Sequence, residues 1–272
     1  MPVAHIGPEF VSGSARLSAA ALAKRQGLTG EIWKGLNKER AMVDPGYGFF
    51  HLERWRSGSG ATTATMGDPL YATQATTGTC NLIAGPDGFG SLLELDCNST
   101  TAGQGIQVQA RGLSVNPVAG MEISFEAMCR ARDLSTTGVQ HFIGLSDFDT
   151  SIHASGVPTT GDKIGFASIT NNLISEFVMN TSGVPAAATG TPHTWIDGDV
   201  TSDGTEWVKL GFLWRVDEFV RPFVQGVEFS SDLAISTDPA AAVCPSFVCQ
   251  ANTSIDPILE IAYYAFGYKY PA

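Results

Sequence analysis

Glu206-Trp-Val-Lys-Leu-Gly-Phe-Leu-Trp214 is followed, after a short charged break, by Phe219-Val-Arg-Pro-Phe-Val-Gln-Gly-Val227. Both segments are rich in the β-branched and aromatic residues that favour strands, and Val216-Asp217-Glu218 between them predicts a tight turn. Gly226 predicts a second turn where the second segment ends. Side chains of the first segment alternate between two faces: Val208, Leu210, Phe212 and Trp214 on one, and Trp207, Lys209 and Arg215 on the other. The pattern predicts a hairpin of an antiparallel sandwich, whose broad faces bind or pack rather than catalyse.

Strand patterns recur on both sides of this hairpin, with turn residues between them. The further candidates are Leu92–Asp96, Ile106–Ala110, Glu122–Arg130, Val139–Leu145, Lys163–Ile169, Leu173–Asn180 and Ile258–Tyr268. No pattern of helical length intervenes between these strands, which argues against βαβ units. The predicted fold class is therefore mainly β, an antiparallel jelly-roll sandwich.

The N-terminal residues have a different character. Pro and Gly residues make residues 1–13 an extended arm, and a helix is predicted at Ala15–Gln26. A second helix is predicted at about Gly30–Met42, with an apolar face and Asp44-Pro45 after it. The residues that we expect to dock this segment on a partner are Ile32, Trp33, Leu36, Arg40 and Val43.

Two short amphipathic helices cannot stabilise themselves in water, so their apolar faces must pack on the body, on a symmetry mate or on a different protein. We expect residues 1–56 to be a docking segment and residues 57–272 to be the sandwich, with 57–79 as linker or weak edge structure.

Several of these segments together resemble a known family. The order of Glu122-Ile-Ser-Phe-Glu-Ala-Met, Phe142-Ile-Gly-Leu-Ser-Asp, Asp162-Lys-Ile-Gly-Phe166 and the Trp207 hairpin resembles the concanavalin A-like (laminin G-like) jelly roll. Under half of the chain carries this resemblance, and the order of the motifs is more specific than any one of them. Modules of this kind occur in lectins, in glycanases and in structural proteins of tailed-phage virions, so the resemblance implies an architecture rather than one function.

Charge limits the kinds of partner. Residues 1–56 carry eight basic and five acidic side chains, a net charge of +3, whereas the remaining 216 residues carry eight basic and 22 acidic ones, a net charge of −14. An acidic body disfavours nucleic acid as a partner. No run approaches the ~18 apolar residues of a membrane span, and no signal peptide is recognised, so we expect a protein of the cytosol or one assembled there.

The five cysteines are Cys80, Cys97, Cys129, Cys244 and Cys249. Their spacings and the scattered histidines do not match a zinc site. Cys129 shares a strand face with apolar residues and is expected to be a buried small hydrophobe. Cys80–Cys97 or Cys244–Cys249 are pairs that could form a bridge in an oxidising setting, and the sequence leaves this open.

Catalysis has little support in the sequence. Glycanases of the concanavalin-like class carry a Glu-x-Asp-x-x-Glu arrangement that points carboxylates into one groove, and this chain lacks it. Glu122 and Glu126, on one face of a strand, are the nearest approach, followed by Glu94 and Asp96. We interpret Glu122 and Glu126 as the solvated face of a half-buried strand, and we expect no enzyme and no cofactor.

Two kinds of binding site remain as alternatives. Acidic loops favour calcium weakly, and the candidate ligands are Asp147, Asp149, Asp197, Asp199 and Asp203. Exposed aromatic rings stack on sugars, and the candidates for that role are Trp195, Tyr264 and Tyr268, with Tyr263 and Tyr270 beside them.

The leading functional hypothesis is a non-enzymatic virion structural protein. We expect a head decoration (cement) protein of a tailed phage, localised in a virion that assembles in the host cytoplasm, with capsid or other virion proteins as partners. A homo-oligomer is expected, and a trimer is preferred on analogy. The alternative is a glycan-binding adhesin or receptor-binding fibre domain, and a polysaccharide-cleaving enzyme is the third hypothesis.

Overall fold

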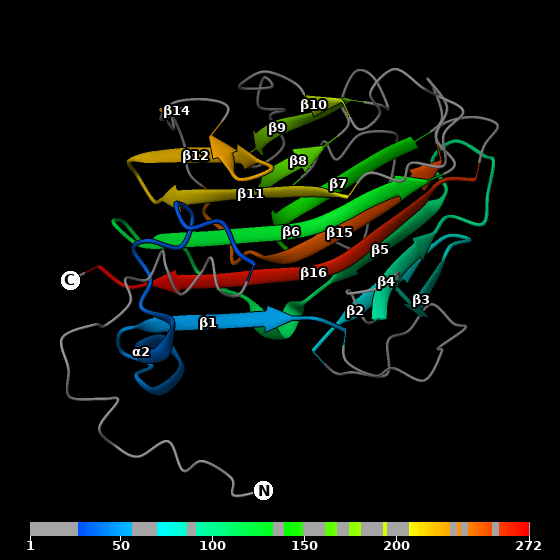
Figure 1. Ribbon diagram of the computed structural model, residues 1–272. Helices are drawn as coiled ribbons and strands as arrows, with labels where there is room; N and C mark the ends of the chain where they lie inside the picture. The colour runs from blue at the N-terminus through cyan, green and yellow to red at the C-terminus, as the bar shows by residue number, and fades with distance from the viewer. Residues whose placement is uncertain are drawn as a thin grey trace, which may run out of the picture.

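The structure, a computed structural model, describes residues 27–55, 70–85, 91–132, 139–148, 161–167, 174–180, 193–194, 207–228, 233–234, 239–251 and 256–271. The predicted arm at residues 1–13 and the predicted helix at Ala15–Gln26 lie outside the described residues. Figure 1 shows two antiparallel sheets stacked face to face, as the strand patterns predict.

The first sheet contains nine of the described strands. Its main path runs β13 (Val227–Glu228), β12 (Phe219–Val224), β11 (Val208–Arg215), β6 (Glu122–Arg132), β16 (Ile258–Lys269), β4 (Ser91–Asp96) and β3 (Thr79–Ala84). β14 (Leu233–Ala234) pairs with β12, and β1 (Gly48–Glu53) pairs with β16. The long β16 thus has two neighbours on one edge, β4 along its first half and β1 along its second, with a bulge between Ile261 and Tyr263.

The second sheet contains seven of the described strands. Its order is β10 (His193–Thr194), β9 (Ile174–Asn180), β8 (Lys163–Ala167), β7 (Val139–Ser146), β15 (Cys244–Ala251), β5 (Gly105–Gln109) and β2 (Ala72–Ala75). The strand register fixes which side chains of each sheet face the other sheet.

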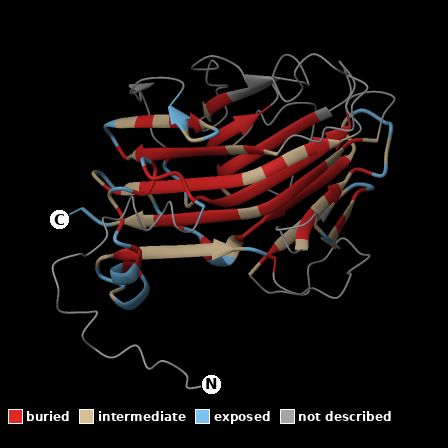
Figure 2. Ribbon diagram, in the orientation of Figure 1, coloured by how far each residue is buried: buried red, intermediate tan, exposed pale blue. Residues whose placement is uncertain are grey.

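Aromatic rings fill the space between the two sheets. Phe125 of β6 stacks on Phe212 of β11 and also contacts Phe247 of β15, with ring centroids 5.5 and 6.3 Å apart. The ring of Phe177 on β9 meets Phe212 edge to face at 5.7 Å. Figure 2 shows the central strands of both sheets as mostly buried.

The predicted hairpin is confirmed as β11 and β12. Leu210 pairs with Val224 and Arg215 with Phe219, around a turn in which Asp217 has a φ of 65°. Val208, Leu210, Phe212 and Trp214 all face the core, as the alternation predicts. After β12, Gln225 and Gly226 have φ values of 52° and 78°, which identifies the second predicted turn as a tight hairpin turn before β13.

The other predicted strands are found within a few residues of their expected bounds, but several strands were not predicted. β15, at the centre of its sheet, contains Pro245, which the strand pattern treats as a breaker. β1, β2 and β3 also lie outside the predicted set. Because β1 pairs with β16, the predicted border at residue 56 does not separate a docking segment from the sandwich.

The predicted helix at Gly30–Met42 is wrong in its first half. Residues 30–35 form turns, and the helix, α2, covers only Lys38–Val43. Asn37 starts α2 because its side-chain Oδ1 accepts a hydrogen bond from the Arg40 backbone N–H at 3.0 Å. None of the helices in the described part of the chain has the length and apolar character of a membrane span.

Candidate functional site

Residues 27–37, here called the strap, cross the outer face of the nine-stranded sheet before α2 begins (Figure 1). The strap crosses two strands at positions where each strand has a glycine. A Cβ atom on Gly211 of β11 would lie 2.7 Å from Ile32 Cδ1, and a Cβ atom on Gly267 of β16 would lie 2.8 Å from Leu36 Cδ2. These two glycines therefore make room for the strap on the sheet.

A buried carboxylate anchors the strap between those glycines. Glu126 of β6 has no exposed surface, and its Oε2 accepts hydrogen bonds from the backbone N–H of Thr29 at 2.8 Å and from Trp33 Nε1 at 3.4 Å. Its Oε1 accepts from the Tyr263 hydroxyl at 3.2 Å, and Lys209 Nζ lies 3.9 Å away. Burial raises the pKa of Glu126 above its ordinary value, and the hydrogen bonds from Thr29 and Tyr263 and the charge of Lys209 act against that rise. The interpretation of Glu126 as a solvated side chain is wrong.

The predicted docking residues differ in exposure, because three of them belong to the strap and two to α2. Ile32, Trp33 and Leu36 are 1%, 0% and 3% exposed, because they pack on the outer face of the chain's own sheet. They are not available to a partner, so their predicted docking role is corrected. Arg40 and Val43, in contrast, are exposed on α2, Val43 at 80%.

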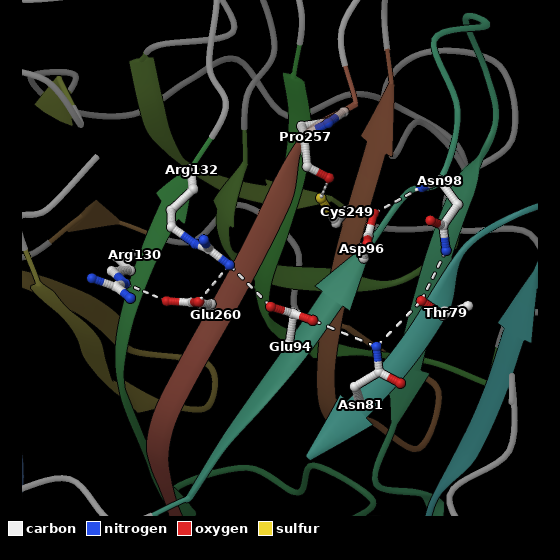
Figure 3. A network of polar contacts seen from close by, with 10 residues as sticks. All are labelled: Thr79, Asn81, Glu94, Asp96, Asn98, Arg130, Arg132, Cys249, Pro257 and Glu260. Carbon is white, nitrogen blue, oxygen red and sulfur yellow. Dashed lines mark hydrogen bonds and ion pairs between the residues drawn. The ribbon is translucent and has the colours of Figure 1, made fainter. Parts of the chain in front are cut away.

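Beyond the strap, the outer face of the same sheet carries a row of side chains, here called the charge ladder. Figure 3 shows all of its members except Trp207. Its members, from β11 toward β3, are Trp207, Arg130, Glu260, Arg132, Glu94 and Asn81. Glu260 forms ion pairs with Arg130 and, at 2.9 Å, with Arg132. Arg132 reaches on to Glu94 at 3.0 Å, and Asn81 donates to Glu94 at 3.4 Å. Charges thus alternate along the row.

The ladder is open to solvent in part. The side chains of Arg130 and Arg132 are 18% and 30% exposed, whereas Glu260 is 1% exposed. At one end the Arg130 guanidinium lies 4.7 Å from the centre of the Trp207 ring, a cation–π contact. The arrangement offers a half-exposed indole, with Arg130 over its ring, next to fixed donors and acceptors on the outer face of the sheet.

A second acidic pair borders the ladder. Asp96 Oδ1 accepts from the Asn98 backbone N–H, and Asp256 Oδ1 accepts from the Ser99 backbone N–H, both at 2.9 Å. Burial raises the pKa of Asp96, and the nearby Asp256 carboxylate contributes to the rise. Glu94 and Asp96 thus both have polar partners, Glu94 in an ion pair with Arg132 and Asp96 in a hydrogen bond with the Asn98 backbone.

The outer face of the seven-stranded sheet is polar but closed. Among the residues whose burial the structure describes, the following amide and hydroxyl side chains on this face are buried: Gln107, Gln109, Gln140, Ser146, Ser246 and Gln250. Gln109 Nε2 donates to Ser146 Oγ at 3.0 Å and to Ser246 Oγ at 3.3 Å. Since these polar side chains are buried, whereas the guanidinium groups of the ladder are partly exposed, the candidate site is the ladder of the nine-stranded sheet.

The predicted binding residues are only partly placed. Tyr264 is fully buried, and its hydroxyl lies 2.8 Å from that of Tyr71, so its predicted role in sugar stacking is wrong. Tyr268 is half-buried against Phe49, at 5.6 Å between ring centres. Trp195 lies outside the described residues.

The predicted calcium ligands are also only partly described. Asp147 is described, whereas Asp149, Asp197, Asp199 and Asp203 lie outside the described residues. Within the described ranges no three His, Cys, Asp or Glu side chains come together in a way that would hold a metal ion.

Sequence reasoning missed the ladder. Arg130, Glu260 and Glu94 lie on three predicted strands, at positions that alternate with apolar side chains. A strand pattern does not say which strands are neighbours. The pairing of β6 with β16 and of β16 with β4 brings the three together. The signal present in the sequence was charge at the outward positions of otherwise apolar strands.

Comparisons with known proteins identify the fold. No family model and no curated protein matches the sequence. Among solved structures, peanut lectin superposes with a TM-score of 0.53 at 12% identity, over 83% of this chain and 99% of the lectin. The endo-1,3-beta-glucanase of Streptomyces sioyaensis gives 0.50 at 11% identity, over 81% and 96%.

The Emp47p carbohydrate recognition domain gives a TM-score of 0.50 at 10% identity, over 79% of this chain and 96% of that domain. At such identities a likeness shows the fold alone. The chain has the concanavalin-like jelly-roll sandwich that lectins and glucanases share, which confirms the architectural part of the resemblance.

Proposed function

We propose that this chain is a non-catalytic carbohydrate-binding sandwich, which holds a glycan on the charge ladder of its nine-stranded sheet. The observation that carries the proposal is the half-exposed Trp207 ring beside Arg130, at the end of a row of fixed hydrogen-bonding groups. Indole faces stack on the apolar faces of sugar rings, while guanidinium, carboxylate and amide groups bond to sugar hydroxyls.

The occupied carboxylates favour binding over cleavage. A glycosidase needs one carboxyl group to donate a proton and a second to act as nucleophile or base. Glu260 and Glu94 are cross-strand neighbours, but both are held by Arg132, and Glu260 is also held by Arg130. Carboxylates bound to guanidinium groups are poorly suited to proton transfer, which supports a binding role.

The fold adds support of a general kind. Peanut lectin and the Emp47p carbohydrate recognition domain are, by their names, proteins of carbohydrate recognition, and both share the architecture of this chain. The glucanase shares it as well, so the preference for binding rests on the ladder rather than on the fold.

A glycan array with the wild-type protein, Trp207→Ala and Arg221→Ala tests the proposal. Arg221 is a matched control, since its guanidinium lies 4.7 Å from the Phe219 ring on the same sheet, away from the ladder. We expect Trp207→Ala to raise the dissociation constant of any bound glycan at least tenfold, which is a loss of about 1.4 kcal/mol of binding free energy. Arg221→Ala should bind as the wild type does.

The result can go against the proposal in two ways. A wild-type protein that binds no glycan on a broad array would end it. Binding that is equal in the wild type and in Trp207→Ala would place any glycan elsewhere on the molecule.

A virion structural role is the second candidate, and one observation favours it. Met42 and Val43, adjacent on α2, are 71% and 80% exposed, and Arg40 is exposed on the same helix. Adjacent exposed apolar side chains mark a place where a partner gains by covering them. In this proposal a head decoration protein would contact its capsid neighbour through α2, with the strap staying on its own sheet.

The double variant Met42→Ser, Val43→Ser tests this role, with Val227→Ser as the control because Val227 is also exposed, at 67%. We expect the double variant to lower the number of copies on purified particles at least tenfold, with the control unchanged. Purified particles that contain no copy of the chain would rule the role out.

A further inference from the structure

Two cysteine thiols from different sheets touch in the core. Cys97 directly follows β4 of the nine-stranded sheet, and Cys249 lies in β15 of the seven-stranded sheet. Their sulfur atoms are 3.4 Å apart, and both residues have no exposed surface. Cys249 also donates to the Pro257 carbonyl at 3.4 Å (Figure 3), and that carbonyl accepts the Cys97 backbone N–H at 3.2 Å. The two thiols are therefore held in place from both sides.

The remaining cysteines have other surroundings. Cys129 Sγ donates to the Val208 carbonyl at 3.5 Å, and Cys244 Sγ lies 3.8 Å from Ser246 Oγ. All five cysteines are described, and all are free thiols in this structure. The neighbours in sequence, Cys80 with Cys97 and Cys244 with Cys249, are not the pair that the fold brings together.

We propose that Cys97 and Cys249 form a disulfide that joins the two sheets when the chain folds in the presence of a disulfide oxidant. The thiolate of one cysteine attacks the oxidant RSSR, which forms a mixed disulfide and releases one RS⁻. The second thiolate then attacks the protein sulfur of that mixed disulfide and releases the second RS⁻. The two thiol protons pass to the two reagent thiolates, so two protein thiols are oxidised and one RSSR is reduced to two RSH.

The separation of the two sulfur atoms is compatible with the bond. A disulfide needs about 2.05 Å between its sulfur atoms and close Cβ atoms, so two thiols at 3.4 Å require only a small adjustment of their side chains. Both strands are fixed by the pairing of β16 with β4 and of β15 with β5. Strand pairing therefore holds the two cysteines near each other in the folded chain.

The bond forms during folding rather than in the closed protein. Hydrogen bonding to Cys249 and burial raise the pKa of the Cys97 thiol far above its ordinary value, and the carboxylates of Asp256 and Asp96 act in the same direction. A buried thiol that stays protonated does not react with an external disulfide, because the thiolate is the nucleophile. Cys97 and Cys249 must therefore exchange with the oxidant before the two sheets close.

The bond closes a loop between positions 152 residues apart. Loops of this length give a large reduction in the entropy of the unfolded chain. We expect the oxidised protein to unfold at a temperature roughly 5–15 °C above that of the reduced protein.

The experiment refolds the reduced, denatured full-length chain in a buffer of reduced and oxidised glutathione. Free thiols are then counted by alkylation under denaturing conditions, and the linked peptides are identified by mass spectrometry. Three free thiols and a Cys97–Cys249 peptide are expected. Cys129→Ala should keep the bond, whereas Cys97→Ala and Cys249→Ala should each leave all four remaining cysteines reduced.

A folded, oxidised sample with five free thiols overturns the proposal, and so does a bond between any other two cysteines. Should refolding in vitro fail, the same count is made on the protein produced in a bacterial periplasm, where disulfides form during folding. The melting temperatures of the oxidised and reduced wild type provide the second readout, and equal values would contradict the expected gain in stability.

Discussion

The backbone N–H of Thr29 donates a hydrogen bond of 2.8 Å to the buried carboxylate of Glu126, which lies 97 positions later in the chain. This bond joins the strap to the centre of the nine-stranded sheet. Lys209 supports it from the side, because its Nζ donates to the Gly27 carbonyl at 2.6 Å. The first described residues are thus fastened to the chain's own sandwich by polar groups as well as by apolar packing.

Glu126→Gln is expected to change how stability depends on pH. Because burial raises the folded-state pKa of Glu126, the folded protein binds more protons than the unfolded chain from about pH 4.5 upward. The contribution of Glu126 to stability is therefore full below the unfolded pKa and is lost as the pH rises through the folded pKa. The wild type should lose stability across this range relative to Glu126→Gln.

Urea unfolding at pH 4, 5.5 and 7.5, followed by tryptophan fluorescence, measures this difference. The glutamine can accept from Thr29 and donate to the Tyr263 hydroxyl, which can itself donate to Gly27. Glu126→Ala is the contrasting variant, since it leaves buried donors without an acceptor and should cost about 1–3 kcal/mol. A difference between the wild type and Glu126→Gln that does not change with pH would contradict the prediction.

Gly211→Ala and Gly267→Ala should weaken the packing of the strap on the nine-stranded sheet. A Cβ atom on Gly267 would lie 2.8 Å from both Leu36 Cδ2 and the Phe49 carbonyl oxygen, and only the first of these can move easily. We expect a loss of about 1–3 kcal/mol and faster proteolysis near residue 30. Gly46→Ala is the control, because Gly46 is exposed and its added Cβ would meet only Asp44 Oδ1, at 3.3 Å.

Trp33→Ala tests whether the strap is part of the fold or an appendage. Trp33 is fully buried and its ring meets Phe50 edge to face at 5.3 Å, so the truncation should cost about 3–5 kcal/mol of unfolding free energy. Val43→Ala, on the exposed side of α2, should change stability by less than about 0.5 kcal/mol. Equal effects of the two substitutions would show that the strap is not packed as described.

Glu260→Gln should destabilise the protein through the charge ladder. The buried carboxylate balances Arg130 and Arg132, and its loss removes an ion pair from each of these two partly buried guanidinium groups. We expect a cost of about 1–3 kcal/mol in urea unfolding. Glu218→Gln is the matched control: the Arg215–Glu218 pair is 40% and 45% exposed and should contribute less than about 1 kcal/mol.

Local patterns predicted the strands better than they predicted their neighbours. Alternation along Val208 to Trp214 gave the correct inward face, because a face of period two is a property of one strand. β15 was missed because Pro245 breaks the pattern, although its carbonyl still accepts the Ala110 N–H at 2.8 Å. Charge at Arg130 and Glu260 was visible, but their contact depends on a pairing of strands 130 positions apart.

The strap shows a different limit of sequence reasoning. An apolar run containing Ile32, Trp33 and Leu36 predicts a surface to be covered, but the pattern does not say what covers it. The answer lies in residues far along the chain, in Gly211 and Gly267, whose missing side chains leave room. Packing on the chain's own body was one of three predicted possibilities, and it is the one found.

Each sheet has, as an internal strand, one of the last two strands of the described sequence, β15 or β16. β16 lies between β6 and the β4–β1 edge, and β15 lies between β7 and β5. During synthesis on the ribosome, every earlier strand therefore emerges before the two strands that join the halves of each sheet. The nascent chain must remain open, with apolar strand faces available to chaperones, until residues 244–269 have left the exit tunnel.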